Sequence, residues 1–419
     1  MQTVIGIDDT DSRERGMCTT YAARLVARRL RERGHRVSEI RLVRLNPAVE
    51  HKTRGNAALA IHTAAPPAVA FDAATGVVNE TAETDDERTN PGVVVATAVD
   101  EPVVAFAADA VSTFHTIEDA DRLVAERDYR SAGWGVGRGK IGALAAVGAH
   151  AAFDDWTYEY IAYRDPDRWG TPRDVDVDSL FAAADAAYPG AWDTVDRGEG
   201  APVCVPNAPG PILYGIRGDD PVALARVAAG VESEPVHDRA LFVTNQGTDV
   251  HVQPGKLGDL SEGRAYRLTA DVVEAPETGP GGHVFFAVGD GDERLACVAF
   301  EPTKRFRDRV RDLRVGDRVT VVGEVTDGTL KLEKFAVRDL QETTLATPTC
   351  PTCGRSMESA GADQGYRCRD CGTSAPGRVE VPVSRDLEAG WYEVPPVARR
   401  HVAKPLIRGG FDAPTHPER

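Results

Sequence analysis

Two closely spaced pairs of cysteines constrain this chain more than any other feature of its sequence. Cys350 and Cys353 form one C-x2-C motif, and Cys368 and Cys371 form a second, with 14 residues between the pairs. Two such motifs place four thiolates tetrahedrally around Zn2+, and this interval falls just short of the usual spacing of roughly 15–20 residues. The pattern predicts a structural zinc ribbon, and unrelated buried cysteines are the alternative. Four protein ligands leave no open coordination position for chemistry.

The rest of the sequence favours a reduced, intracellular location. The other three cysteines, Cys18, Cys204 and Cys297, are scattered and give no disulfide framework. The chain opens directly into an apolar segment without a basic leader, so no secretory signal is expected. No apolar run approaches the roughly 18 residues of a transmembrane helix. We therefore expect a cytoplasmic protein with no membrane partner.

The charge balance is acidic but does not exclude RNA. The 419 residues include 65 acidic and 49 basic side chains, for a net charge of −16, and only 7 of the basic residues are lysine. An Asp-rich, Lys-poor surface is expected of a protein that works in concentrated salt, as in haloarchaea, and an ordinary acidic enzyme is the alternative. In molar salt counterion release contributes little, so an RNA-binding protein depends on shape, stacking and hydrogen bonds.

Hydrophobic periodicity predicts a multidomain α+β protein. Strands and helices alternate to about residue 195, and a Pro-, Gly- and Asp-rich stretch follows. The strand–helix–strand order after residue 212 suits a ferredoxin-like domain, and five strands with a helix between the third and fourth suit an OB-fold barrel. The predicted units are a catalytic domain at 1–195, a ferredoxin-like domain at 196–262, an OB-fold at 263–342, a zinc ribbon at 346–376 and a basic, aromatic tail at 377–419.

A carboxylate cluster follows the first strand. Asp8, Asp9 and Asp11 are of the type that a hard cation such as Mg2+ requires, although Asp is so abundant here that the string alone is a weak signal. A helix beginning near Thr19 and Thr20 would offer free N–H groups to phosphates, and a hydroxyl there could accept a phosphoryl group. Simple helix capping by these threonines is the alternative.

A glycine-rich stretch precedes an Ala-rich helix. Gly137 and Gly139 would let backbone amides approach phosphates, and Arg138 and Lys140 would add positive charge. We assign these four residues to nucleotide binding. A flexible loop without a ligand is the alternative, because no strong βαβ context surrounds the motif.

Two segments are candidates for RNA binding. One of the rings of Phe285 and Phe286 should face out of the barrel and could stack on a base, unless both pack inside. The tail interleaves aromatic and basic residues, which is typical of phosphate contacts, unless it is salt-bridged to an acidic surface. The tail residues assigned to RNA are Arg399, Arg400, Lys404 and Arg408.

Motifs along the whole chain resemble those of the archaeal tRNA-isoleucine 2-agmatinylcytidine synthetases. They are GIDDTDS at 6–12, GMCTT at 16–20, KTRGN at 52–56, TNPG at 89–92, GRG at 137–139 running to GALAAVG at 142–148, LYGIRG at 213–218, GHVFF at 282–286 and WYEVPP at 391–396. They occur in order over essentially the full length, which makes the resemblance specific.

The resemblance implies a kinase-like catalytic domain, a ferredoxin-like domain, an OB-fold and a zinc ribbon. It implies that ATP, which goes to AMP, activates the C2 oxygen of the wobble cytidine in an isoleucine tRNA with a CAU anticodon. Agmatine then displaces that oxygen, so that the anticodon reads AUA. By the same resemblance, the three aspartates bind metal and phosphate, Thr19 is phosphorylated, and loop 137–139 contacts phosphate. Val136 stands where the family often has a lysine, a charge that Lys140 could supply.

Two other functions remain open from the sequence. A non-catalytic single-strand-binding protein would explain an OB-fold with a zinc ribbon but would leave the first 260 residues without a role. A small-molecule kinase would consume ATP without tRNA and yield ADP. The agmatine pocket requires an acidic or aromatic wall, and no residue stands out for it.

Overall fold

A nine-stranded sheet organises the first 250 residues of the computed structural model, which describes residues 2–52 and 55–419. The strand order is β5-β4-β1-β3-β2-β11-β6-β10-β7, and among the pairings only β2 with β11 is parallel. The strands are β1 (Thr3–Asp8), β2 (Val37–Arg44), β3 (Ala57–Thr63), β4 (Gly92–Ala96), β5 (Arg130–Gly133), β6 (Thr157–Arg164), β7 (Ala191–Trp192), β10 (Ile212–Gly218) and β11 (Val236–Thr244).

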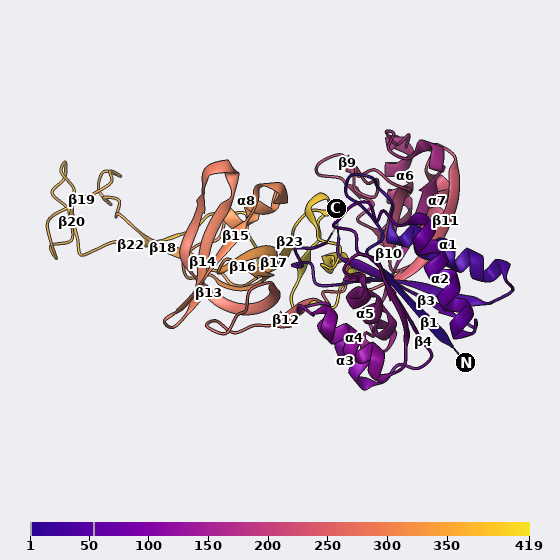
Figure 1. Cartoon of the computed structure of the whole chain (residues 1–419). Coiled ribbons are helices and arrows are strands. Elements are labelled where there is room, and N and C mark those ends of the chain that lie inside the picture. The colour runs from indigo at the N-terminus through magenta and orange to yellow at the C-terminus, as the bar shows by residue number, and fades with distance from the viewer. Residues whose placement is uncertain (1, 53–54) are drawn as a thin grey trace.

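Helices cover both faces of this sheet because the central strands are apolar on both sides. Ile5 and Ile7 pack under α1 and α2, while Val4 and Val94 pack under α3, α4 and α5 on the opposite face (Figure 1). These helices are α1 (Thr19–Glu32), α2 (Pro67–Thr81), α3 (Glu101–Asp109), α4 (Ile117–Glu126) and α5 (Gly139–Ala152). No helix in the described part of the chain has the length and apolar character needed to cross a membrane.

The predicted boundary between 1–195 and 196–262 does not coincide with a break in the fold. Strands β6 and β7 and helix α6 (Val177–Ala187) form one unit with β10, α7 (Pro221–Gly230) and β11, in the spatial order β11-β6-β10-β7. Its core joins Ala162 and Leu180 to Leu213 and Leu224 across that boundary. The expected boundary is corrected, because antiparallel pairing of β6 with both β10 and β11 makes β6 inseparable from the later strands.

Five strands form a closed barrel after residue 263. Each pairs with two others in the circular order β13-β14-β15-β17-β16, and the contact between β15 and β17 is parallel. Helix α8 (Phe306–Arg311) lies between the third and fourth strands, as expected, and packs Phe306 into the barrel core. The strands are β13 (Arg264–Thr278), β14 (Val284–Asp290), β15 (Glu293–Ala299), β16 (Arg318–Thr326) and β17 (Thr329–Asp339).

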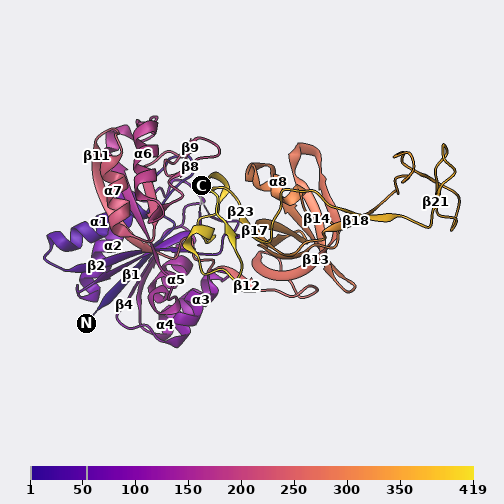
Figure 2. The same cartoon turned by 180° about the vertical axis from the view of Figure 1, so that it is seen from behind.

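The C-terminal tail returns to the barrel and lies between it and the sheet body (Figure 2). Strand β23 (Gly390–Glu393) pairs with β17 and with β24 (Thr415–His416), and strand β12 (Val252–Pro254) adds to β13. Trp391 and Tyr392 are buried against the barrel. The tail is therefore part of the barrel's packing and not a free extension.

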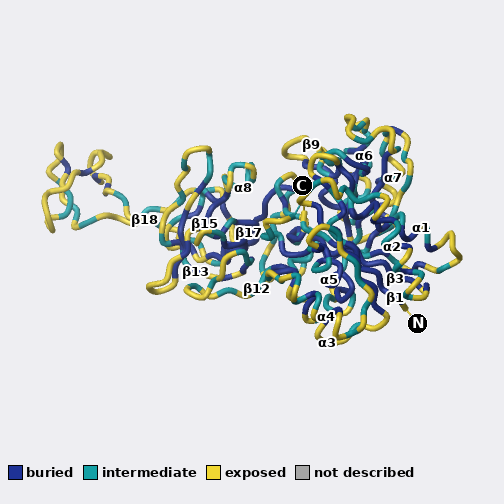
Figure 3. Tube along the Cα trace, viewed as in Figure 1, coloured by how far each residue is buried: buried dark blue, intermediate teal, exposed yellow. Residues whose placement is uncertain are grey.

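The cysteine module projects from the far end of the barrel on a two-stranded ladder. Strands β18 (Thr343–Ala346) and β22 (Val379–Pro382) pair antiparallel and lead to three short strands, β19 (Glu358–Ser359), β20 (Tyr366–Arg367) and β21 (Ser374–Ala375). Its core is small, and most of its trace is exposed or half-buried (Figure 3). So small a core favours stabilisation by a bound metal ion.

This arrangement predicts different outcomes for two deletions. Joining Glu342 to Val383 removes only the ladder and the cysteine module, and these residues are already linked by a backbone hydrogen bond of 2.8 Å. That protein should keep its melting temperature and its ATP binding. Truncation after Leu340 also removes β23 and β24 and should lower the melting temperature by several degrees or more, which calorimetry would measure. Equal melting temperatures for the two proteins would contradict a structural role for the tail.

Candidate active site at the end of strand β1

A cleft of about 1110 Å3 opens where β1 ends, between the sheet body and the barrel. From the body it is lined by the predicted residues Asp8, Asp9, Asp11, Arg138 and Gly139. The barrel and tail contribute Glu324, Asp327, Lys331 and Arg400 to the opposite wall. The structure thus brings the predicted carboxylates and one predicted arginine together, in a space large enough for a nucleotide and part of a second substrate.

Local hydrogen bonds fix the two carboxylates. The backbone of Asp9 adopts a left-handed conformation with φ of 59°, and its N–H donates to Asp8 Oδ1 over 2.7 Å. The amide of Asn90 donates to Asp9 Oδ2 over 2.9 Å. Such a backbone conformation is uncommon outside glycine, and it turns both carboxylates toward the cleft.

Helix α5 approaches the ends of β1 and β4 so closely that only glycine fits. A Cβ on Gly142 would lie 1.9 Å from Asp8 Oδ2, and one on Gly6 would lie 1.9 Å from the Ala143 carbonyl oxygen. A Cβ on Gly92 would lie 2.0 Å from the Lys140 nitrogen. The first turn of α5 therefore packs directly beneath the carboxylates and excludes water from that side.

This burial shifts the acidity of both carboxyls. Burial, with the neighbouring Asp9 carboxylate, raises the pKa of Asp8 well above its ordinary value. Burial raises the pKa of Asp9 to about 6, against the opposing hydrogen bond from Asn90. Carboxylates are the ligands that a hard divalent cation prefers, and the charge of such a cation would offset the repulsion between Asp8 and Asp9.

Thr19 lies in the first turn of α1 but does not cap it. Cys18 occupies the N-cap position, without a side-chain cap hydrogen bond. The Thr19 Oγ1 atom accepts a hydrogen bond from Thr10 Oγ1 over 3.1 Å, and the side chain is buried in the carboxylate loop. Thr20 Oγ1 lies 3.0 Å from Cys18 Sγ. The alternative of simple capping therefore does not describe Thr19, which joins the helix to the loop of Asp8 and Asp9.

The glycine-rich loop differs from the expected phosphate cradle. The amides of Gly137, Gly139 and Lys140 donate to carbonyl oxygens within the protein, and the amide of Val136 donates to Asn90 Oδ1 over 2.9 Å. Lys140 Nζ pairs with Asp121 on α4 and does not line the cleft, so it does not replace the charge missing at Val136. Arg138 alone supplies positive charge from this loop to the cleft, where it lowers the pKa of Asp9 after the larger effects named above.

Asn90 joins these parts, a role that its place in the TNPG motif did not predict. Its amide binds Asp9, its carbonyl accepts from Gly139, and its side chain binds Val136. The Asn-Pro pair at this position is a turn signal that could have marked it. Lys52 and Asn56 of the KTRGN motif also line the cleft, and other lining residues that the sequence did not single out are His51, His115 and Glu118.

Most of the predicted RNA-binding tail is engaged within the protein. The Arg399 guanidinium is buried between Asp193 and Glu393, and Arg408 is buried between Asp155 and Asp219. The prediction that these two arginines bind RNA is corrected, because their charges are already paired inside the fold. These contacts match the alternative of a salt-bridged tail.

The remaining predicted RNA contacts are divided between surface and interior. Arg400 pairs with Glu324 at the cleft wall, and Lys404 lies half-buried over the ring of Phe411. Phe285 is 43% exposed on β14. Phe286 is buried in the barrel core, so the prediction that it stacks on a base is corrected: alternating residues of a strand face opposite sides.

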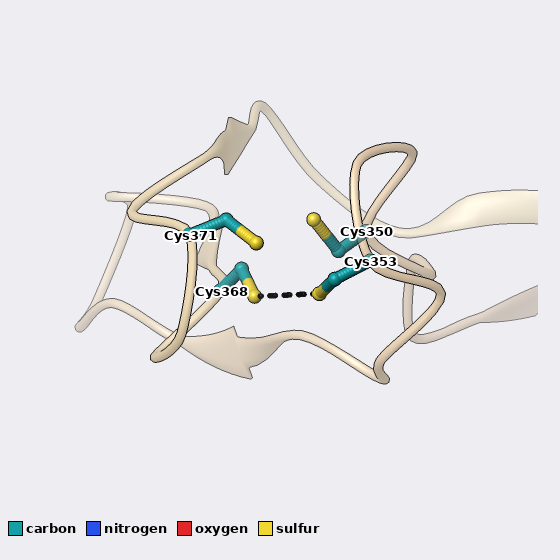
Figure 4. Close-up of side chains that lie close together, drawn as sticks. All are labelled: Cys350, Cys353, Cys368 and Cys371. Carbon is teal, nitrogen blue, oxygen red and sulfur yellow. Dashed lines mark hydrogen bonds between the residues drawn. The ribbon is translucent and has the colours of Figure 1, made fainter.

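The four cysteines converge as the spacing predicts (Figure 4). Their sulfur atoms all lie within 4.8 Å of one another, and Cys353 Sγ is 3.6 Å from Cys368 Sγ. Four thiolates around Zn2+ at about 2.3 Å would be separated by about 3.8 Å, so this donor set fits a zinc ion. The site lies far from the cleft, at the opposite end of the barrel (Figure 1).

The fold and the cleft together define the class of protein to which this chain belongs. This is a modular α/β protein whose carboxylate-lined cleft faces a β-barrel that carries a zinc ribbon.

Comparison with known proteins identifies the family within that class. Models of the TiaS TCKD domain, the TiaS FLD domain and the TiaS C-terminal zinc ribbon domain match residues 4–67, 137–251 and 347–387. TiaS of Haloquadratum walsbyi, the 2-agmatinylcytidine synthetase of isoleucine tRNA 2, is 53% identical over 100% of both chains. The chain superposes on a crystal structure of TiaS with isoleucine tRNA 2 and ATP with a TM-score of 0.91, at 43% identity over 100% of each chain. It superposes on a crystal structure of TiaS with isoleucine tRNA 2, AMPCPP and agmatine with a TM-score of 0.88, at 40% identity over 100% of each chain. The chain belongs to the TiaS family of tRNA 2-agmatinylcytidine synthetases.

The close packing of α5 predicts that Gly142→Ala separates activity from stability. The new methyl group would displace the Asp8 carboxylate, so ATP turnover should fall by about a hundredfold. Gly148→Ala is the matched control: its Cβ meets the Val103 carbonyl oxygen at 2.5 Å, away from the site. It should lower the melting temperature but spare turnover. Parallel losses in both variants would contradict the assignment.

The raised pKa of Asp9 predicts a gain in stability when its charge is removed. The folded chain retains a proton that the unfolded chain releases, so the free energy of unfolding falls as pH rises from about 4 to about 6. Asp9→Asn should therefore stabilise the metal-free protein at pH 7, by about 1–3 kcal/mol, while it abolishes turnover. Denaturant unfolding at pH 4 and pH 7 measures the effect, with exposed Asp72→Asn as control. A destabilised, active Asp9→Asn protein would contradict this role.

Proposed function

We propose that this chain carries out the reaction of its family. In an ATP-dependent ligation it attaches agmatine to C2 of the wobble cytidine of an isoleucine tRNA with a CAU anticodon, and ATP goes to AMP. The observation that carries this proposal is the placement of Asp8, Asp9 and Arg138 in a cleft between an α/β body and a barrel. The reacting nucleotide and the RNA can approach that cleft from opposite walls.

The chemistry explains why phosphoryl transfer comes first. The C2 oxygen of cytidine is a poor leaving group, and phosphorylation converts it into phosphate, which leaves readily. The amine of agmatine then attacks C2: a C–N bond forms, the C–O bond breaks, and the amine loses a proton. Arg138 faces the charge that develops on the transferring phosphoryl group.

Asp8 and Asp9 would hold a Mg2+ ion, and Asp11 lines the same wall. A bound Mg2+ neutralises phosphate charge and orients the triphosphate. Burial beneath α5 keeps the two carboxylates desolvated, and Asn90 orients Asp9 for the ion. The raised pKa of Asp9 means that protons compete with the cation, so Mg2+ affinity should decline below about pH 6.

Thr19 is the proposed acceptor of the γ-phosphoryl group, a transfer that leaves ADP; transfer of the β-phosphoryl group to the C2 oxygen then leaves AMP. Its hydroxyl lies in the carboxylate loop beside Thr10, and the hydrogen bonds from Thr10 hold it there. Because Thr19 is buried, the loop must shift for its hydroxyl to reach a γ-phosphate.

The cleft also has the acidic wall that a guanidinium ligand requires. Glu118 on α4 lines it from the sheet body, and Glu262, Glu324 and Asp327 line it from the side of the barrel. Agmatine has an amine at one end and a guanidinium at the other, so an acidic side chain at the far end of the cleft could hold it with the amine toward C2.

Names for the modules follow from their topology. We assign the first five strands and their helices to the kinase-like catalytic domain, the unit from β6 to β11 to a ferredoxin-like fold with its usual strand order, and the closed barrel to an OB-fold. We propose that the exposed ring of Phe285 and the zinc ribbon bind the tRNA. A non-catalytic RNA-binding protein would not need the buried carboxylates.

Mass spectrometry of tRNA tests this function. After incubation with protein, ATP and agmatine, the isoleucine tRNA should gain the mass of agmatine less one water, at the wobble nucleotide. The same tRNA with uridine at that position is the control and should not change. Thr19→Ala should abolish the modification far more severely than Thr20→Ala. A protein that consumes ATP equally well without tRNA would contradict the proposal.

A further inference from the structure

An aromatic patch lies on the outer face of the barrel, outside the cleft. It consists of Phe285 on β14, His283 in the loop before that strand and Phe300 directly after β15. The imidazole of His283 lies near both phenyl rings, with its centroid 5.2 Å from that of Phe300 and 6.4 Å from that of Phe285. Both phenyl planes stand at 89° to the imidazole. The patch thus gathers three rings from two strands and one loop.

The two phenyl rings of the patch are open to solvent. Phe285 is 43% exposed and Phe300 is 36% exposed. Within residues 263–342, all of which the structure describes, the only other exposed large apolar side chain is Val315. Single apolar side chains on a surface are ordinary, whereas contiguous ones mark binding sites. The patch is therefore a candidate contact for a ligand with an apolar face.

The loop before β14 holds the rings without covering them. Gly281, which has φ of 77°, carries no side chain beside the imidazole; a Cβ there would lie 3.5 Å from His283 Nε2. A Cβ on Gly279 would lie 3.0 Å from the Phe285 ring, so the loop backbone supports that ring from one side. The amide of Glu301 donates to His283 Nδ1 over 2.9 Å and fixes the imidazole. The rings are thus positioned before any ligand binds.

Strand pairing connects the patch to the cleft. Phe285 lies opposite Val298 on β15, and Val298 lies opposite Lys331 on β17. Lys331 in turn lies opposite Glu324 on β16, and both of these side chains line the cleft. Residues opposite one another share a face of the sheet, and neighbouring strands lie about 4.8 Å apart, so Phe285 is about 10 Å from Lys331 along this row. The patch therefore continues the barrel wall of the cleft outward.

The chemistry of the patch fits an unpaired base. Two partly exposed phenyl rings offer far less than the roughly 800 Å2 per partner that a stable protein interface buries, which argues against a second copy of this chain. Base–aromatic stacking requires little area, and salt screens it less than it screens phosphate contacts. With a net charge of −16, the chain gains little from general attraction to phosphates. In OB-folds, the class to which we assign this barrel, oligonucleotides likewise bind across the second and third strands.

On the basis of the proposed function, we propose that His283, Phe285 and Phe300 bind one unpaired base of the tRNA anticodon loop while the target nucleotide occupies the cleft. A stacked strand advances about 3.4 Å per nucleotide, so it covers 10 Å in about three nucleotides, and an extended strand covers it in fewer. The stacked base thus lies in the same loop as the wobble nucleotide. Stacking there holds the strand in register, so that the wobble base enters the cleft and its neighbours do not.

Binding of isoleucine tRNA to the full-length protein tests the patch. Phe285→Leu keeps an apolar side chain but removes the ring, and it should weaken tRNA binding by about five- to 150-fold, the loss of one base–aromatic stack. Phe285→Tyr keeps the ring and should bind tRNA nearly as the wild type does. Val315→Ala is the control, because it removes exposed apolar surface elsewhere on the barrel, and its tRNA affinity should not change. All four proteins should bind a non-hydrolysable ATP analogue equally.

Abasic nucleotides identify the base that stacks. The wobble cytidine is kept, and every other nucleotide of the anticodon loop loses its base in turn. At one position this loss should weaken binding to the wild type but add nothing to the loss in Phe285→Leu, because both changes remove the same contact. Additive losses at every position would overturn the proposal. A Phe285→Leu protein that binds tRNA as the wild type does, but changes its sedimentation, would overturn it too and make the patch an interface between copies.

The wild-type protein separates this proposal from the proposed function. If the wild type binds the tRNA without attaching agmatine to it, the proposed function is wrong, while coupling between Phe285 and one base still supports the stacking site. If the wild type modifies the tRNA and no base is coupled to Phe285, the stacking site is wrong and the proposed function stands.

Discussion

The contact between the first turn of α5 and the ends of β1 and β4 is the constraint on which the rest of the site depends. It requires glycine at Gly6, Gly92 and Gly142, because each of these positions faces backbone or carboxylate atoms at less than contact distance from any Cβ. The contact half-buries Asp8 and Asp9, and desolvation raises their pKa. The fold therefore holds two carboxylates in a desolvated state, and a bound cation would lower the cost of their charge.

A second constraint comes from the tail, which connects the barrel to the sheet body. Arg399 is buried between Asp193 of the body and Glu393 of β23, and Lys334 of the barrel binds Asp249 through both carboxylate oxygens. Since one wall of the cleft belongs to the barrel, these buried pairs set the width of the cleft. Removing one partner would leave a buried charge unpaired, which is why the tail acts as structure here and not as an RNA contact.

Much of this arrangement could be predicted from the sequence, where the signal was local. The cysteine spacing predicted the four-sulfur cluster, and period-two strands with one helix predicted the barrel. The placement of the Asp8 loop before α1 was also correct. The partners of buried or half-buried ion pairs could not be predicted, because nothing near Arg399 or Lys140 in the sequence indicates the carboxylates that pair with them. The boundary near residue 195 was misplaced because β6 pairs with strands that come much later in the chain, a contact that composition does not encode.

The distribution of basic residues shows how an acidic chain can act on RNA. Most arginines are paired within the fold, as Arg164 is with the buried Glu234, and contribute little field outside it. Of the 7 lysines, Lys52 and Lys331 line the cleft, and Arg138 and Arg400 lie there with them. The cleft thus contains basic side chains among the carboxylates that line it. Buried arginines keep their geometry when salt screens the surface, so recognition in such a protein depends on preorganised contacts and little on net charge.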